Sequence, residues 1–191
     1  MAPGNGFRRV LAAALAGWLL EAAHYTLLVE RYGVGAPAPA LERYLWVTLA
    51  GLLPATTRLL FFMAAFWVSA WLFGLKLDGR SCLEAATYGS LALGAVALLL
   101  TPLAPLGAEG FTAYVNVVYA AELAAQAWGM AVAALDSLPA RTRPLLARLA
   151  AASALAVLLV GLTPAALLTP QAQVYSVIHG VLSGNTPGTR G

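Results

Sequence analysis

The sequence predicts an all-α fold, a single-domain polytopic bundle of about five transmembrane helices with short interfacial helices. Of its 191 residues, 61% are hydrophobic and only 10% are charged, whereas soluble domains carry about a quarter charged residues. Five apolar runs have the length needed to cross a hydrocarbon core of roughly 30 Å. The most continuous apolar stretch, residues 44–75, contains one charged side chain, Arg58.

The first apolar run, residues 10–29, could be read as a secretory signal because Arg8 and Arg9 precede it. A cleaved signal usually ends in a small-residue site directly after its apolar core. Here Glu21 and His24 interrupt the core, and the apolar pattern then resumes. We therefore interpret this run as an uncleaved first transmembrane helix.

The long stretch divides naturally at Pro54, because proline disrupts the interior of a helix. We expect residues 54–75 to form the second span. The preceding segment, residues 41–53, is expected to be a short interfacial or re-entrant helix, or the bent upper part of the second span. Tyr44 and Trp46 suit the membrane interface, and about 13 residues are too few to cross the hydrocarbon core alone.

Three further spans are expected at residues 84–103, 111–135 and 145–168. Small residues recur four apart in the first, third and fourth spans, which predicts close helix packing. The tail, residues 169–191, is expected to be an amphipathic helix lying on the membrane, followed by a disordered end. Its predicted apolar face contains Val174, Val177, Ile178, Val181 and Leu182.

The distribution of basic residues predicts the orientation, since cytoplasmic loops carry an excess of Lys and Arg. With the N-terminus inside and the C-terminus outside, three basic residues lie outside: Arg31, Arg43 and Arg190. Seven then lie on the cytoplasmic side: Arg8, Arg9, Lys76, Arg80, Arg141, Arg143 and Arg148. The chain is therefore expected to be a multi-pass protein integral to the cell membrane.

Four ionisable groups fall within the predicted spans: Glu21, His24, Arg58 and Glu122. Such groups are costly in lipid and are candidates for function. Glu21 and His24 share one helix face, and Arg58 is expected near the outer end of its span, where it could snorkel. We predict a polar cluster of Glu21, His24 and Arg58, with Glu122 as an alternative partner of Arg58. A structural ion pair is the favoured interpretation, and a proton or ion relay or a binding site is the alternative.

The fourth span carries a polar stripe of Asn116, Tyr119, Glu122 and Gln126 within about 120° of one helical face. Asn and Gln commonly form hydrogen bonds between membrane helices. We therefore predict an interhelical polar seam, with a cavity lining as the alternative.

No catalytic, metal or cofactor site is expected. The two histidines lie in separate segments and Cys82 is the single cysteine, so the residues of a zinc site are missing. Protease, hydrolase, nucleotide-binding and dinucleotide-binding motifs are also missing. The scattered basic residues argue against nucleic acid, so the expected partners are the lipid bilayer and other membrane proteins or a second copy.

Two segments carry a family resemblance. GRSCLEAATYGSLALGAVALLLTP leads into the third span with Tyr88 near its start, and VVYAAELAAQAWGMAVAAL precedes a short basic loop and a featureless fifth span. This layout, over residues 45–168, resembles the five-helix Yip (Ypt/Rab-interacting) family of membrane proteins in its prokaryotic form. The resemblance implies a five-helix membrane domain and assigns no role to any residue.

We therefore expect a non-enzymatic membrane protein, resembling Yip-family proteins, that acts through helix packing or interaction with other membrane proteins. A small transporter or channel that uses the Glu21, His24, Arg58 and Glu122 groups is one alternative. An accessory subunit of a membrane complex is another.

Overall fold

The computed structural model describes residues 4–34, 39–136, 138, 143–161 and 170–184. Within them the chain is all-α, as predicted, and five helices are long and apolar enough to cross a membrane. The protein is thus a multi-pass helical membrane protein. The elements, in order, are α1 (Gly4–Arg31), α2 (Ala40–Leu72), α3 (Gly79–Leu100), the 3₁₀ turn η1 (Thr101–Leu103), α4 (Ala108–Leu135), α5 (Arg143–Gly161) and α6 (Pro170–Leu182).

Helix α2 is continuous through Pro54, so the predicted division between residues 53 and 54 is wrong. The alternative that residues 41–53 form the upper part of the second span is the correct one. Transmembrane helices tolerate an internal proline where Ser or Thr side chains and neighbouring helices bind backbone groups near it. Here Thr56 and Thr57 donate to the carbonyls of Leu52 and Leu53.

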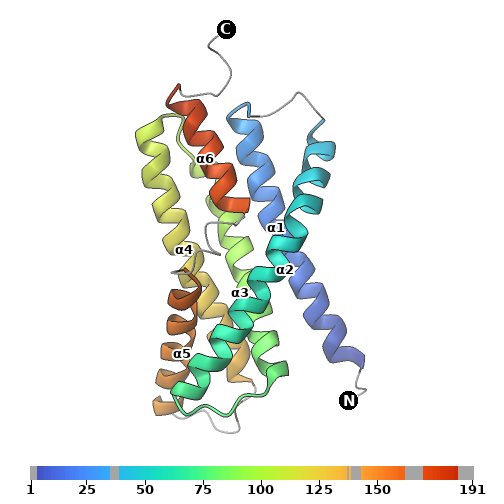
Figure 1. Ribbon diagram of the computed structural model, residues 1–191, viewed down its shortest axis with the longest axis vertical. Helices are drawn as coiled ribbons and strands as arrows, with labels where there is room; N and C mark the ends of the chain where they lie inside the picture. Colours follow the sequence, from blue (N-terminus) through green and yellow to red (C-terminus); the bar gives the residue numbers. More distant parts are fainter. Residues whose placement is uncertain (1–3, 35–38, 137, 139–142, 162–169, 185–191) are drawn as a thin grey trace.

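The tail contains the predicted helix, α6, but this helix packs on the bundle and does not lie by itself on a membrane surface. Figure 1 shows α6 beside α4 and α1, above α5. Its buried side chains, Tyr175 and Ile178, join an aromatic cluster with Phe111 of α4. Val177, assigned to the apolar face, is 52% exposed. The predicted disorder of residues 185–191 and the end of the fifth span, residues 162–168, lie outside the described residues.

Helices α1, α3 and α4 form a closely packed layer, and small residues allow it. A Cβ atom added to Gly94 of α3 would lie 2.5 Å from the carbonyl oxygen of Gly17 in α1. One added to Gly129 of α4 would lie 2.9 Å from the Cα of Gly89 in α3. Backbone atoms therefore meet directly at both interfaces, which confirms the packing predicted from the small-residue stripes.

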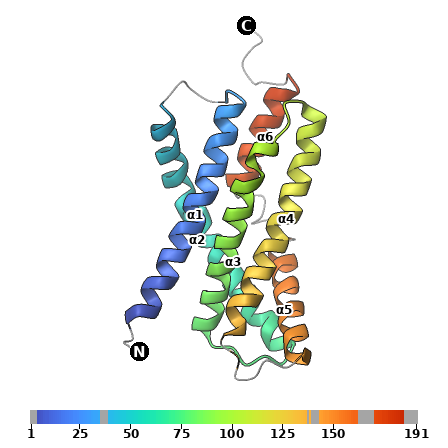
Figure 2. The ribbon, with the colours of Figure 1, turned by 180° about the vertical axis from the view of Figure 1, so that it is seen from behind.

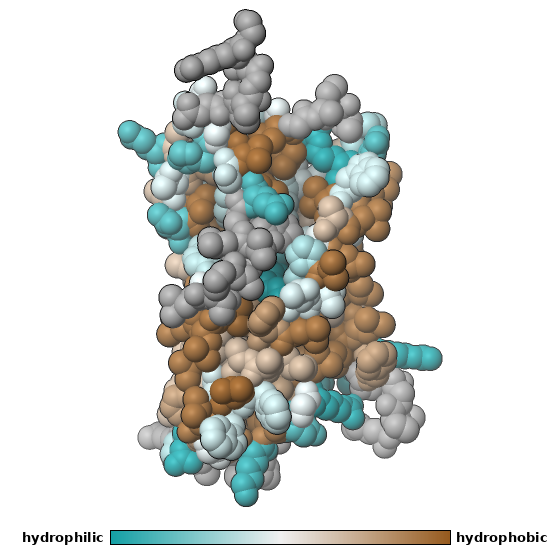
Figure 3. Space-filling model, in the orientation of Figure 1, coloured by the Kyte–Doolittle hydropathy of each residue, from teal (hydrophilic) through white to brown (hydrophobic). Residues whose placement is uncertain are grey.

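Helix α2 crosses this layer diagonally. It begins at the end of the molecule where α1 finishes and reaches α5 and the start of α3 at the opposite end (Figures 1 and 2). Its lower half joins α3, α4 and α5 in the main hydrophobic core, around Phe62, Phe66 and Leu149. Hydrophilic residues gather at the two ends of the molecule, and apolar residues cover much of the sides between them (Figure 3).

Helix α3 starts at a side-chain cap. Asp78 accepts a hydrogen bond of 2.7 Å from the backbone N–H of Ser81, which satisfies one of the unpaired donors at the helix start. Hydrogen bonding by Ser81 also lowers the pKa of Asp78 below its ordinary value. This cap fixes the short turn between α2 and α3.

Candidate functional site

The middle of the bundle holds an ion pair between α1 and α2. A guanidinium nitrogen of Arg58, Nη2, donates to Oε1 of Glu21. The other carboxylate oxygen of Glu21 accepts a hydrogen bond of 3.4 Å from the Tyr25 hydroxyl. Glu21 is 1% exposed, so its charge is offset within the protein. The contact between Glu21 and Arg58 expected from the sequence is therefore present.

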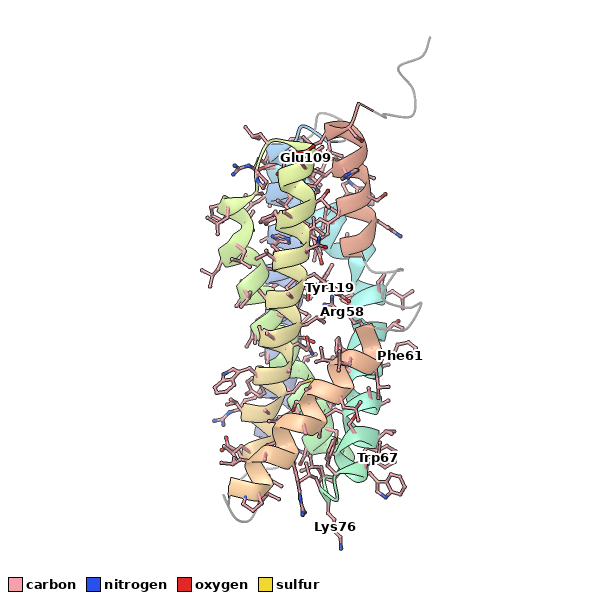
Figure 4. The ribbon with its side chains drawn as sticks, turned by 90° about the vertical axis from the view of Figure 1, so that its left-hand side faces the viewer. Arg58, Phe61, Trp67, Lys76, Glu109 and Tyr119 are labelled. Atoms are coloured by element: carbon pink, nitrogen blue, oxygen red, sulfur yellow. The ribbon has the colours of Figure 1, made fainter. Side chains whose placement is uncertain are left out.

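Arg58 lies deeper than expected. Because α2 begins at Ala40 and not at Pro54, Arg58 is close to its middle (Figure 4). The exposed residues Trp46 and Trp67 are about 32 Å apart along the helix at 1.5 Å per residue, which matches the two aromatic belts of a bilayer with a core of roughly 30 Å. Arg58 lies between these two Trp residues, near the middle of α2 and not four residues from its outer end as expected. Its expected snorkelling stays a prediction.

Glu122 of α4 belongs to the same polar centre. It is 1% exposed and interacts electrostatically with both Arg58 and Tyr25. We call Glu21, Tyr25, Arg58 and Glu122 the central polar cluster. It contains two buried carboxyl groups and one guanidinium, so Arg58 carries the positive charge that both acids face.

His24 is directed away from this cluster. Its Nδ1 lies 2.7 Å from the hydroxyl of Thr101 and its Nε2 lies 2.9 Å from the hydroxyl of Tyr175. None of the hydrogen bonds found in the described part of the chain joins His24 to Glu21 or Arg58. The predicted three-residue cluster thus separates into an ion pair and a histidine network of His24, Thr101 and Tyr175.

The histidine network links three elements of the bundle. The Thr101 hydroxyl lies 2.7 Å from Nδ1 of His24 and also 3.1 Å from the carbonyl oxygen of Ala97. Through its two ring nitrogens, the fully buried His24 side chain connects α1 to η1, directly after α3, and to α6.

The predicted polar seam on α4 is only partly buried. Glu122 and Gln126 face the bundle, whereas Asn116 is exposed and its assignment to the seam is wrong. The buried face is centred on Phe111, Tyr114 and Val118, and Asn116 lies on the other side of the helix. Tyr119 is 38% exposed at the edge of that face.

Two polar side chains of α4 make contacts other than the predicted hydrogen bonds. Gln126 is fully buried against Gly89, and its amide atoms have no hydrogen-bond partner among the described residues. The hydroxyl of Tyr119 lies close to Gly161 at the end of α5. The stripe therefore contributes packing, with Glu122 as its charged member.

A cavity of about 70 Å³ lies between α1 and α2, next to the ion pair. Glu21, Arg58 and Ser90 form its polar floor. Its walls are apolar side chains, together with Thr56: Leu11, Ala14, Leu15, Trp18, Leu52, Ala55 and Leu59. Leu11, Leu15 and Leu52 are 46–49% exposed on the outside of their helices. We call this space the lateral cavity, because its open side faces the direction of the surrounding lipid.

Trp18 closes one end of the lateral cavity. Its indole ring lies directly on Gly51 of α2, where there is no room for a Cβ, and its Nε1–H donates to the carbonyl of Thr48 at 3.0 Å. Below this contact α1 and α2 diverge (Figures 1 and 2). The cavity is therefore a consequence of two helices that meet above it, at Trp18 and Tyr44, and diverge below.

Several members of these sites were not singled out from the sequence, among them Trp18, Tyr25, Thr101 and Tyr175. Tyr25 follows Glu21 by one helical turn, a spacing that could have marked it. Trp18 and Tyr175 carry no such local signal, since their partners are 30 and 151 residues away. Among the described residues no group of three or more metal-binding side chains occurs.

Comparisons with protein-family models, with curated proteins and with solved structures found no match. The Yip-like layout therefore stays a prediction from the sequence.

Proposed function

We propose that the protein is a non-enzymatic membrane protein that acts by packing against other membrane proteins, as its Yip-like layout implies. The observation that carries this proposal is the exposure of α2. Only 17% of its apolar window is buried within the bundle, compared with 28–50% for the other four spans. The longest helix is thus the one with the most side surface free for a lateral partner.

The free face of α2 is large and shaped by aromatic residues. Phe61 and Trp67 project away from the bundle (Figure 4). Its exposed apolar residues below the middle are Leu60, Phe61, Trp67, Val68, Trp71 and Leu72. Aromatic side chains are enriched where proteins bind one another, so this face supports a partner helix as well as lipid.

The central polar cluster supports binding over transport. Glu21 and Glu122 are each 1% exposed and Arg58 is paired with Glu21. Buried pairs of this kind hold helices together and fix their register. The proposal therefore gives the cluster a positioning role for α2.

The test is photo-crosslinking in native membranes. A photoreactive phenylalanine analogue replaces Phe61 on α2, and the matched control replaces Trp128, which is 73% exposed on α4. The expected result is a discrete protein adduct from position 61 that position 128 does not form, identified by mass as a second copy or another membrane protein. Lipid adducts alone at both positions would contradict the proposal.

A small transporter is the second candidate, and the lateral cavity favours it because it reaches Glu21 and Arg58. The measurement is proton or cation flux in proteoliposomes, with a dye that reports the internal pH. Flux that is lost in Glu122→Gln while the variant stays folded would favour transport. Flux equal to that of empty liposomes would leave the packing function as the better proposal.

A further inference from the structure

The lateral cavity has a donor that the protein itself does not use. A guanidinium group carries five N–H donors, and the only hydrogen bond of Arg58 within the described residues uses Nη2. Its Nε is buried without a partner in this part of the chain. The side chain keeps 12% of its surface exposed and forms part of the cavity floor. The site therefore offers hydrogen-bond donors to a visiting acceptor.

The charges around the floor decide which acceptor fits. Glu21 and Glu122 both face the single guanidinium of Arg58. An anionic ligand would add a negative charge next to the carboxylate of Glu21, which already pairs with Arg58, in a medium where charge is poorly screened. An uncharged acceptor adds no charge and can still accept a hydrogen bond from an N–H group of Arg58.

The depth and the shape of the lateral cavity further restrict the kind of ligand that fits. The floor lies near the middle of α2, between Trp46 and Trp67, whereas the ester groups of bilayer lipids lie outside the hydrocarbon core. The walls are leucine and alanine, and the mouth opens between exposed leucines. A cavity of about 70 Å³ exceeds the about 10–15 Å³ that one water needs, yet it holds only the end of a larger molecule.

We propose that the lateral cavity binds an uncharged lipophilic carbonyl compound, of the kind represented by membrane-soluble quinones, whose carbonyl oxygen accepts a hydrogen bond from Arg58. The carbonyl end enters from the side of the bilayer and lies on the polar floor. The apolar remainder lies along Leu11, Leu15 and Leu52 at the mouth. This site is distinct from the exposed face of α2 below the middle, so it goes beyond the proposed interaction function.

Trp18 lines the cavity and serves as its reporter. A variant that keeps Trp18 alone, with Phe at the other four positions, is reconstituted in nanodiscs and titrated with a decyl-substituted benzoquinone, which quenches indole fluorescence. A second variant that keeps only Trp128, exposed on α4, measures quenching by quinone dissolved in lipid. We expect saturable quenching of Trp18 and linear quenching of Trp128.

Two substitutions test the floor and the walls. Ala14→Leu fills the cavity, and Ala12→Leu adds the same group two residues away on the exposed side of α1. We expect Ala14→Leu to weaken binding at least tenfold and Ala12→Leu to leave it unchanged. The double variant Glu21→Leu with Arg58→Leu removes the donor together with the carboxylate that pairs with it. Glu122 then stays as the one carboxyl group of the central polar cluster, and binding should again weaken at least tenfold.

Three results would overturn the proposal. Linear quenching of Trp18, parallel to that of Trp128, would mean that the cavity holds only water or lipid chains. Equal saturable quenching by a brominated decane would show that the carbonyl is not recognised. Unchanged affinity in the folded double variant would remove Arg58 from the site.

Discussion

Helix α1 meets its two main neighbours in opposite ways. Against α3 it packs backbone to backbone, with Gly17 lying against Gly94. Against α2 its contacts are made by side chains, among them the Trp18 ring on Gly51 and the ion pair of Glu21 with Arg58. The lateral cavity lies beside these two contacts.

The difference shows how small and charged residues serve separate purposes in one bundle. Glycines remove side chains, so van der Waals contact is continuous and leaves no room for a ligand. An ion pair acts at one point and keeps two helices at a fixed distance without filling the space around it. We infer that the α1–α3 interface supports the fold by continuous packing and that the α1–α2 interface is the one with space for a ligand.

Among the substitutions that test this comparison, a change at Arg58 should lower the stability of the protein most. Arg58→Leu leaves both Glu21 and Glu122 buried without their cation, and removing one partner of a buried pair costs about 3–5 kcal/mol. The free energy of unfolding, measured by SDS titration in mixed micelles with circular dichroism, should fall by that amount. A change below about 1 kcal/mol would mean that the pair carries little of the α1–α2 contact.

Adding a side-chain atom at the α1–α3 interface should cause the next largest loss of stability. In Gly94→Ala the added Cβ meets the Gly17 carbonyl at 2.5 Å, and backbone cannot yield as a flexible side chain can. Overpacking of this kind costs about 3 kcal/mol. Gly79→Ala, at a position where a Cβ meets nothing within 4 Å, is the control. Equal melting temperatures for the two variants would contradict direct backbone contact.

A smaller effect is expected where α6 joins α1. Tyr175→Phe removes the hydroxyl that lies 2.9 Å from His24 Nε2 and leaves that buried nitrogen without its hydrogen-bond partner, at a cost of about 1–2 kcal/mol. Amide hydrogen exchange should become faster in α6 and stay unchanged in α3. Val177→Ala, on the exposed side of α6, should leave exchange as it is. Faster exchange throughout the bundle would indicate that the histidine network does more than dock α6.

The smallest effect is expected at the start of α3, remote from both interfaces. Asp78→Ala removes the cap on Ser81 and should cost about 1 kcal/mol. The lowered pKa of Asp78 means that the ionised form is favoured by folding, so its stabilisation is present above the ordinary carboxyl pKa of about 4 and is lost as pH falls further. Asp78→Asn should keep the cap without this acid dependence. If the wild-type protein and Asp78→Asn lost stability identically as pH falls, the cap would be excluded as the source of the acid dependence.

Much of the fold follows from the sequence because its causes are local. Apolar runs of about 20 residues set the five spans, and small residues four apart marked the α1–α3 and α3–α4 contacts. The prediction at Pro54 was wrong because it applied the energetic cost of proline inside a helix of a soluble protein. Membrane helices tolerate an internal proline, so α2 continues through Pro54 and Arg58 lies near its middle.

The candidate site was predictable only in part. The contact of Glu21 with Arg58 was predicted because the two are opposite charges on neighbouring spans, although the expected depth of Arg58 was wrong. Tyr25 lies one turn from Glu21. The partner of His24, Tyr175, comes from a tail helix that was expected on the membrane surface. Asn116 was misplaced because polarity alone does not fix the buried arc, which the aromatic residues Phe111 and Tyr114 set.

A double-mutant cycle on Glu21 and Arg58 tests the central claim most directly, namely that this pair holds α1 and α2 together at mid-depth. Unfolding free energies are measured for Glu21→Leu, Arg58→Leu and the double variant. Arg58→Leu should be the least stable, since two acids lose their cation, and Glu21→Leu should cost less, because Glu122 still faces Arg58. The double variant should be more stable than Arg58→Leu, with a coupling of about 1–3 kcal/mol. Additive losses, with the double variant the least stable, would contradict the account.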